Sequence, residues 1–207
     1  MPIQAVIFDF GGVLMRTHDY AGRQKWADRL GLSGPDLEKA IFESEAARRA
    51  MVGEVPFTAL RQHVATVFRL DGAESDRLWD DFWAGDRLDR ELVDFLAGLR
   101  PRYRTAILSN AWSDARDLFT ERLGLDRAVD LMVISAEEGL AKPDARIYQC
   151  ALDRLQVRPE EAVFVDDFAV NVEAACALGI HGILFRSTEQ VLAAVRQQLD
   201  GTGAGCL

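Results

Sequence analysis

The chain has 207 residues, which is enough for one sizeable domain or for one domain with a modest insertion. Apolar residues make up 49% and charged residues 28%, proportions that are ordinary for a soluble globular protein. The formal net charge of −9 argues against non-specific binding to nucleic acid or to an anionic membrane, so we expect neither as a partner.

Cysteine usage and the absence of a recognisable leader predict a cytoplasmic protein. The three cysteines, Cys150, Cys176 and Cys206, show no CxxC spacing, and Cys150 and Cys176 lie in apolar-periodic segments, where we expect reduced core thiols. The sequence contains neither the charged and apolar regions of a secretory signal nor an apolar run of membrane-spanning length. It gives no indication of the oligomeric state.

The first predicted strand ends at an acidic residue. Residues 5–8 are a short apolar run rich in β-formers, Asp9 follows at once, and Gly11 and Gly12 come next. Glycines let the backbone approach a ligand closely, and open α/β sheets bind ligands at the carboxyl ends of their strands. Taken alone, this stretch fits an ordinary turn acid as well as it fits a functional Asp9.

About seventy residues, 19–86, are predicted to be helical throughout. Apolar residues recur at helical spacing in four segments, residues 20–30, 33–47, 58–70 and 75–83. So much helix between two strands is too long for a simple crossover. It predicts an inserted helical cap, residues 15–88, whose small core includes Trp79, Phe82 and Trp83.

From Asp89 onward the sequence alternates between predicted strands and predicted helices. Strands are expected at residues 105–108, 131–134, 162–165 and 182–185, and helices at 91–99, 113–123, 142–155, 171–178 and 189–199. This alternation implies an α/β fold, a parallel sheet with helices on both faces, built from residues 1–14 and 89–200. The glycine-containing tail, residues 201–207, is predicted to be disordered.

Polar residues gather where the predicted strands end, together with one lysine before a predicted helix. They are Asp9, Ser109, Asn110, Lys142, Asp166 and Asp167. Each one alone fits a turn, a helix cap or a solvated surface position, since turns favour Asp. The βα alternation places all of them at one edge of the sheet, which turns alone do not explain.

The residue types at this edge are suited to phosphoryl chemistry. Carboxylates from separate strands form an oxygen-rich site for Mg²⁺, for which Asp166 and Asp167 are the predicted anchor. A carboxylate such as Asp9 can act as a nucleophile, forming an aspartyl-phosphate that water then hydrolyses. A lysine and a hydroxyl can neutralise and orient phosphoryl oxygens, the roles predicted for Lys142 and Ser109.

The chain resembles the haloacid dehalogenase superfamily over nearly its whole length. The four family motifs match FDFGGVL at residues 8–14, ILSN at 107–110, KP at 142–143, and FVDD at 164–167 with Asn171 beyond. The resemblance implies a Rossmann-like core, a mobile helical cap and, most often, Mg²⁺-dependent hydrolysis of a small phosphorylated metabolite. We assign substrate contacts to Gly11, Gly12, Ser109, Asn110 and Lys142, and metal contacts to Asp9, Asp166, Asp167 and the main-chain oxygen of Gly11.

One position departs from the family pattern. Phosphatases of the family usually carry a second Asp two residues after the nucleophile, where this chain has Gly11. Losing a general acid–base group typically costs roughly 10²–10⁴-fold in rate. Three hypotheses follow: a phosphatase that uses another acid or water, a 2-haloacid dehalogenase-type hydrolase, and a weakly catalytic or non-catalytic protein that binds a phosphorylated ligand. The pair Asp166-Asp167 favours the phosphatase, because neighbouring carboxylates repel without a cation and the family's metal-free dehalogenases usually lack this pair.

Overall fold

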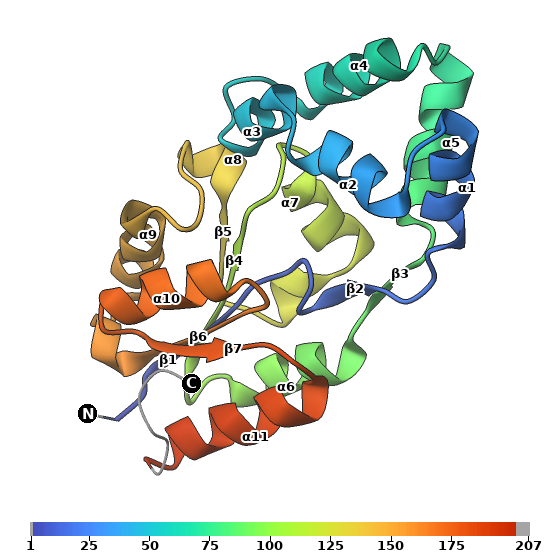
Figure 1. Ribbon diagram of the computed structural model, residues 1–207. Helices are drawn as coiled ribbons and strands as arrows, with labels where there is room; N and C mark the ends of the chain where they lie inside the picture. Colours follow the sequence, from blue (N-terminus) through green and yellow to red (C-terminus); the bar gives the residue numbers. More distant parts are fainter. Residues whose placement is uncertain (1, 202–207) are drawn as a thin grey trace.

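The computed structural model describes residues 2–201 and contains a parallel sheet in the order β5-β4-β1-β6-β7 (Figure 1). Every neighbouring pair of strands in this sheet is parallel. The strands are β1 (Ala5–Phe8), β4 (Arg104–Ser109), β5 (Leu131–Ile134), β6 (Ala162–Asp166) and β7 (His181–Leu184). The predicted α/β fold with a parallel sheet is therefore confirmed.

Helices cover both faces of the sheet. On one face lie α6 (Arg90–Leu99) and α11 (Thr188–Leu199), and on the other lie α9 (Ala145–Leu155) and α10 (Ala169–Ala177) (Figure 1). Each pair of helices packs its apolar side chains on the sheet, so the sheet separates two hydrophobic clusters. This layering explains why the strands are nearly continuous apolar runs.

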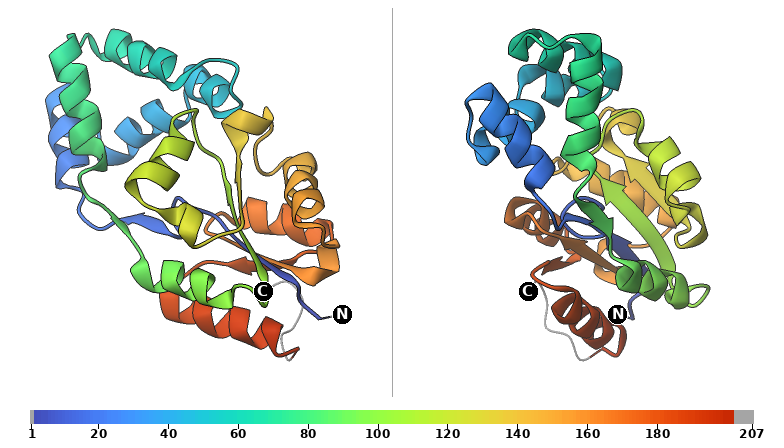
Figure 2. Two further views of the ribbon diagram at one scale, coloured as in Figure 1. Left: turned by 180° about the vertical axis from the view of Figure 1, so that it is seen from behind. Right: turned by 90° about the vertical axis from the view of Figure 1, so that its right-hand side faces the viewer.

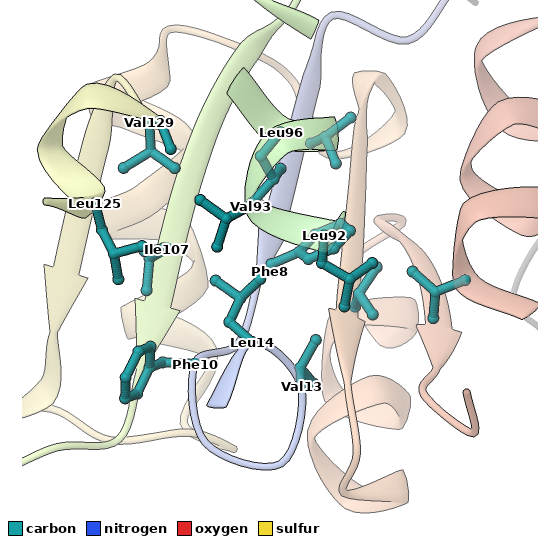
Figure 3. Close-up of a cluster of buried hydrophobic side chains, with 14 of the residues drawn as sticks. Phe8, Phe10, Val13, Leu14, Leu92, Val93, Leu96, Ile107, Leu125 and Val129 are labelled. Atoms are coloured by element: carbon teal, nitrogen blue, oxygen red, sulfur yellow. The ribbon is translucent and has the colours of Figure 1, made fainter. Parts of the chain in front are cut away.

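Strand β1 contributes to both clusters. Val6 and Phe8 pack toward α6 and α11, whereas Ala5 and Ile7 pack toward α9 and α10. Successive side chains of a strand point to opposite faces, which gives one short strand two cores. Figure 3 shows Phe8 in the first cluster, beside Leu92 of α6. The buried β1 fixes the main chain that leads directly into Asp9.

A separate group of helices lies between β1 and β4 in the sequence. It comprises α1 (Ala21–Leu30), α2 (Gly34–Phe42), α3 (Glu45–Met51), α4 (Phe57–Phe68) and α5 (Gly72–Trp83). These helices surround an apolar cluster of their own and lie away from α6 and α11 in both figures of the whole chain (Figures 1 and 2). Residues 33–47 form two helices, because the Ser44 side chain accepts a hydrogen bond from the Ala47 amide and starts α3.

A short antiparallel ribbon joins these helices to the sheet. It consists of β2 (Met15–Thr17) and β3 (Asp86–Leu88), with Met15 opposite Leu88 and Thr17 opposite Asp86. No strand was predicted here, because three-residue strands carry too little pattern and their partners lie far apart in the sequence. The domain division at residues 15–88 stays a prediction.

Several elements around the strands differ from their predicted bounds. Helix α9 begins at Ala145, and not at Lys142, because the Asp144 side chain caps it by accepting from the Arg146 amide. Lys142 and Pro143 precede that helix and are joined by a cis peptide bond. The predicted helix 113–123 is a short α helix followed by a π helix: α7 (Ala115–Asp117) and η1 (Leu118–Arg122). Three further short helices were not predicted: η2 (Leu125–Arg127), α8 (Ser135–Glu138) and η3 (Pro159–Glu161).

The remaining sequence predictions have mixed outcomes. Within residues 2–201, no helix combines the length and apolarity needed to span a bilayer. Cys150 is a free thiol, whereas the expectation of a reduced thiol is wrong at Cys176, which is disulfide-bonded. Sequence spacing does not report which cysteines meet in space. The cytoplasmic location stays a prediction, and residues 202–207 of the predicted tail lie outside the described residues.

Candidate active site

The sheet order brings three of the predicted site residues to one edge. Strand β1 lies between β4 and β6, and Asp9, Ser109 and Asp166 stand at the carboxyl ends of these three strands. The Asp9 amide donates to the Val165 carbonyl over 2.8 Å, which extends the β1–β6 pairing to the acid itself. All three polar side chains are buried. Their positions are therefore fixed by the most regular part of the fold.

Lys142 connects two of the acids. Its ammonium nitrogen lies 2.8 Å from Asp9 Oδ1 and 2.7 Å from Asp166 Oδ2. Only 1% of the lysine side chain is exposed, so these ion pairs are shielded from water. A buried ammonium between carboxylates from two strands places positive charge where a phosphoryl group could bind.

Asn110 holds the main chain of Lys142. The Lys142 amide donates to Asn110 Oδ1 over 2.8 Å, and Asn110 Nδ2 donates to the Lys142 carbonyl over 2.9 Å. Both polar groups of the Asn110 side chain are thereby engaged with the residue that carries the ammonium. Direct contact of Asn110 with a substrate stays a prediction.

Asp166 is held by several donors. Its Oδ1 accepts from the Phe168 amide over 2.7 Å, and Asn171 Nδ2 lies 3.1 Å from both carboxylate oxygens. Tyr148 in turn donates from its hydroxyl to the Asn171 carbonyl over 2.9 Å. Burial, together with the charges of Asp166 and Asp9, raises the pKa of the Tyr148 hydroxyl, which keeps its proton for this hydrogen bond. Sequence reasoning missed Tyr148, because its helical spacing is that of a core residue.

Asp167 completes a cluster of three carboxylates. Asp9, Asp166 and Asp167 each offer an oxygen, and these oxygens lie within 4.8 Å of one another. Asp167 Oδ1 is buried and has no hydrogen-bond partner in the part of the chain that the structure describes. Since buried polar atoms are normally paired, this oxygen is available to a ligand.

The two glycines after Asp9 are in different surroundings. A Cβ atom at Gly12 would lie 2.1 Å from Asp167 Oδ2, and φ is +77° there, so only glycine fits. Gly11 is exposed, and a Cβ atom added to it would meet no atom within 4 Å. The loop is therefore closely packed on the side of Asp167 and open at Gly11. The roles of both glycines toward substrate or metal stay predictions.

Burial and crowding alter the acidity of the cluster. Burial raises the pKa of Asp9 from 3.8 to about 7; the Lys142 ammonium opposes this shift and the Asp166 charge adds to it. Burial and the charge of Asp166 likewise raise the pKa of Asp167 to about 6. Holding both Asp9 and Asp167 ionised is thus costly when, among residues 2–201, Lys142 is the only cation paired with the cluster.

Comparison with known proteins decides the family. The family model of haloacid dehalogenase-like hydrolases matches residues 3–179. The chain belongs to this family of hydrolases. The matched range includes every residue of the site just described, and the resemblance stated from the sequence is confirmed.

Relatives of this hydrolase carry different activities in their names. Ribulose-1,5-bisphosphate 5-phosphatase of Halopiger xanaduensis is 37% identical over 90% of this chain and 86% of its own length. (S)-2-haloacid dehalogenase 1 of a Pseudomonas species is 35% identical over 88% of this chain and 84% of its own. The chain spans only 21% and 38% of the bifunctional epoxide hydrolases 2 of rat and pig, which it also matches.

A solved structure supports the fold of this hydrolase. The magnesium complex of a haloacid dehalogenase family enzyme from Bacteroides thetaiotaomicron superimposes with a TM-score of 0.77. The match covers 95% of this chain and 100% of that protein at 20% sequence identity. Identity at this level shows that the two chains share a fold.

Proposed function

We propose that this hydrolase is a Mg²⁺-dependent phosphatase of a small phosphorylated metabolite and that Asp9 carries the phosphoryl group during turnover. The observation that carries the proposal is the imbalance of charge at the sheet edge. Three carboxylates meet there, and among residues 2–201 only Lys142 forms an ion pair with them. A bound divalent cation would offset the negative charge that Lys142 leaves unbalanced and would allow a phosphorylated substrate to approach Asp9.

The residues present fit a magnesium ion. Mg²⁺ prefers oxygen ligands and usually keeps several waters, so a few carboxylates suffice. Asp9, Asp166 and Asp167 supply those oxygens, and Asp167 Oδ1, which has no hydrogen-bond partner among residues 2–201, is the oxygen most readily offered to the ion. The main-chain oxygen of Gly11 is our further candidate ligand. When bound, the ion neutralises charge that develops on the phosphoryl oxygens.

The protein's own groups divide the remaining work. Asp9 Oδ1 is held by Lys142 and by the Phe10 amide, which leaves Oδ2 to attack phosphorus. The bond from phosphorus to the leaving oxygen breaks, and that oxygen takes a proton from solvent water, because Gly11 offers no acid side chain. A water molecule then attacks phosphorus and gives up a proton to solvent, the bond to Asp9 breaks, and the carboxylate is restored. Lys142 and Ser109 orient the phosphoryl oxygens through both steps.

The relatives support phosphoryl chemistry. Besides the ribulose bisphosphate phosphatase, a D-ribitol-5-phosphate phosphatase of Bacteroides thetaiotaomicron is 25% identical over 86% of this chain. We therefore expect the substrate to be a phosphorylated sugar or polyol. The chain offers no basis for choosing a single compound within that class.

Dehalogenation of a 2-haloacid is the second candidate. The identity to the Pseudomonas dehalogenase and the lack of an acid side chain at Gly11 favour it. In that reaction Asp9 displaces halide from carbon, and water hydrolyses the resulting ester. The pair Asp166 and Asp167 argues against it, because the buried Asp166 carboxylate beside Asp9 hinders ionisation of the nucleophile without a cation.

A substrate screen separates these functions. Phosphate release from sugar and polyol phosphates, and chloride release from 2-chloropropionate, are measured with Mg²⁺ and with a chelator. The phosphatase proposal expects metal-dependent phosphate release that is lost in Asp9→Asn. Chloride release that ignores the chelator would establish the dehalogenase instead. Binding of phosphorylated compounds without turnover would leave a ligand-binding role.

A further inference from the structure

The loop that follows Ser109 connects the site to the helices α1–α5. Figure 1 shows this loop, between β4 and α7, reaching the level of α2 and α3. Each of its first residues has a separate attachment. Asn110 bonds to the main chain of Lys142, and Ala111 exchanges hydrogen bonds with the Ser135 side chain. The next two residues, Trp112 and Ser113, contact the helices α1–α5 instead.

Trp112 packs among the helices α1–α5. It belongs to the buried apolar cluster of those helices, although its chain position is in the sheet-bearing part. Its ring stacks on Phe42 of α2 at 5.6 Å and 14°, and on Phe57 of α4 at 5.0 Å and 13°. Within the described residues, every other member of that cluster lies between residues 26 and 82. The tryptophan is therefore the apolar link between the two groups of elements.

Polar and backbone contacts support the same link. The Phe57 amide donates to Ser113 Oγ over 3.1 Å, at the start of α4. A Cβ atom on Gly53 would lie 2.1 Å from the Ala136 carbonyl oxygen, so the α3–α4 loop rests directly on the backbone of α8. Lifting the helices would break these contacts together with the two aromatic stacks.

Trp112 makes its contribution through the ring. The side chain is 7% exposed, and its indole Nε1 has no hydrogen-bond partner in the described part of the chain. A buried donor without a partner adds nothing to the contact. Stacking and burial of the ring carry the interaction.

We propose that Trp112 is a positioning residue that couples the seating of α1–α5 on the sheet to the placement of Asn110 and Lys142. Two residues separate its stacked ring from Ser109, and one separates it from Asn110. When the helices are seated, Phe42 and Phe57 fix Trp112, and the short loop holds Asn110 against the Lys142 main chain. When they lift, the loop loses this anchor and the ammonium loses its fixed position. The catalytic consequence rests on the phosphatase function proposed above.

The test compares three variants of the full chain. Trp112→Ala removes the ring, and Trp112→Phe keeps a stacking ring without the indole donor. Phe68→Ala is the control, because Phe68 packs on the same cluster without a ring contact to Trp112. Thermal unfolding confirms that each variant is folded at the temperature used.

Hydrogen exchange at the Lys142 amide is the first readout, because that amide bonds to Asn110 and needs no substrate. The second is kcat with acetyl phosphate, a donor whose leaving group is too small to need the helices α1–α5. We expect Trp112→Ala to speed exchange at Lys142 and to lower kcat on the order of 10²-fold, the scale of a 1 Å misplacement. Trp112→Phe and Phe68→Ala should stay near wild type in both measurements.

Two results would overturn the proposed coupling. Equal exchange at Lys142 in Trp112→Ala and Phe68→Ala would overturn the coupling. Equal losses in Trp112→Phe and Trp112→Ala would also overturn it, since the indole donor and not the ring would then matter. If the wild type releases no phosphate from any ester, the proposed function fails, and the exchange measurement still decides the coupling.

Discussion

Lys142 Nζ lies 2.8 Å from Asp9 Oδ1, and only 1% of the lysine side chain is exposed to solvent. The nucleophile proposed for this hydrolase is thus held by a charge that water does not screen.

Removing the ammonium should destabilise the protein strongly. Lys142→Met leaves Asp9 and Asp166 buried without their ion pair, and breaking a buried pair on one side costs about 3–5 kcal/mol. Lys25→Met is the matched control, because Lys25 is 64% exposed and its pair with Asp81 is worth about 1 kcal/mol or less. Urea unfolding of both variants measures the difference, and equal losses would contradict the buried pairing.

Metal-free protein should lose stability as the pH rises from about 4 to about 7. The folded pKa of Asp9 is raised from 3.8 to about 7, so its contribution is complete below the unfolded value and is lost as pH passes the folded value. The pKa of Asp167, which is raised to about 6, changes the stability in the same direction. Unfolding temperatures across this range, in chelator, should show a decline that Asp9→Asn reduces. An identical decline in Asp9→Asn would count against the raised pKa.

The same window should respond to magnesium. A cation that binds the ionised carboxylates lowers their pKa and stabilises the folded state by mass action. Unfolding temperatures with Mg²⁺ should therefore rise most near pH 7, and Asp167→Asn should weaken the effect. A magnesium effect that is unchanged in Asp167→Asn would show that the ion binds elsewhere.

Gly12 and Gly11 should respond differently to the same substitution. Gly12→Ala forces a Cβ atom against Asp167 and strains a φ of +77°, so magnesium affinity and stability should both fall. Gly11→Ala adds a Cβ atom with no neighbour within 4 Å and should be tolerated. Calorimetric titration with Mg²⁺ and thermal unfolding compare the pair. Equal effects at the two positions would argue against close packing of Gly12 on Asp167.

Restoring an acid at position 11 should speed turnover. The space around Gly11 admits a side chain, and general acid–base groups contribute roughly 10²–10⁴-fold. Gly11→Asp should therefore raise kcat above wild type, whereas Gly11→Asn, of similar shape, should not. Equal rates in Gly11→Asp and wild type would mean that proton transfer does not limit this enzyme.

The fold was largely predictable because its strands are short apolar runs separated by helices with clear ends. Residues 131–134 were placed exactly by this pattern, and the acid after β1 followed from it. The ribbon of β2 and β3 was missed, since its strands carry no local periodicity and pair only across the whole helical group. The predicted start of helix α9 was three residues too early, because Pro143 fits the first turn of a helix, whereas the helix is capped by Asp144 and begins at Ala145.

The site was predictable in its residue types and less so in its connections. Because the carboxyl ends of parallel strands lie at one edge of the sheet, the sequence alone predicted that Asp9, Ser109 and Asp166 lie close together. The clamp of Asn110 on Lys142 joins residues 32 positions apart and leaves no pattern in the sequence. Tyr148 was likewise indistinguishable from a core residue until its hydrogen bond to Asn171 was seen.

The central claim is that Asp9 carries the phosphoryl group, and acid quenching of a single turnover tests it most directly. Enzyme in excess is mixed with Mg²⁺ and a radiolabelled polyol phosphate that the substrate screen has identified. We predict protein-bound label that hydroxylamine releases, as an acyl phosphate requires, and none in Asp9→Asn. Turnover without bound label at any quench time, or equal label in Asp9→Asn, would contradict the account.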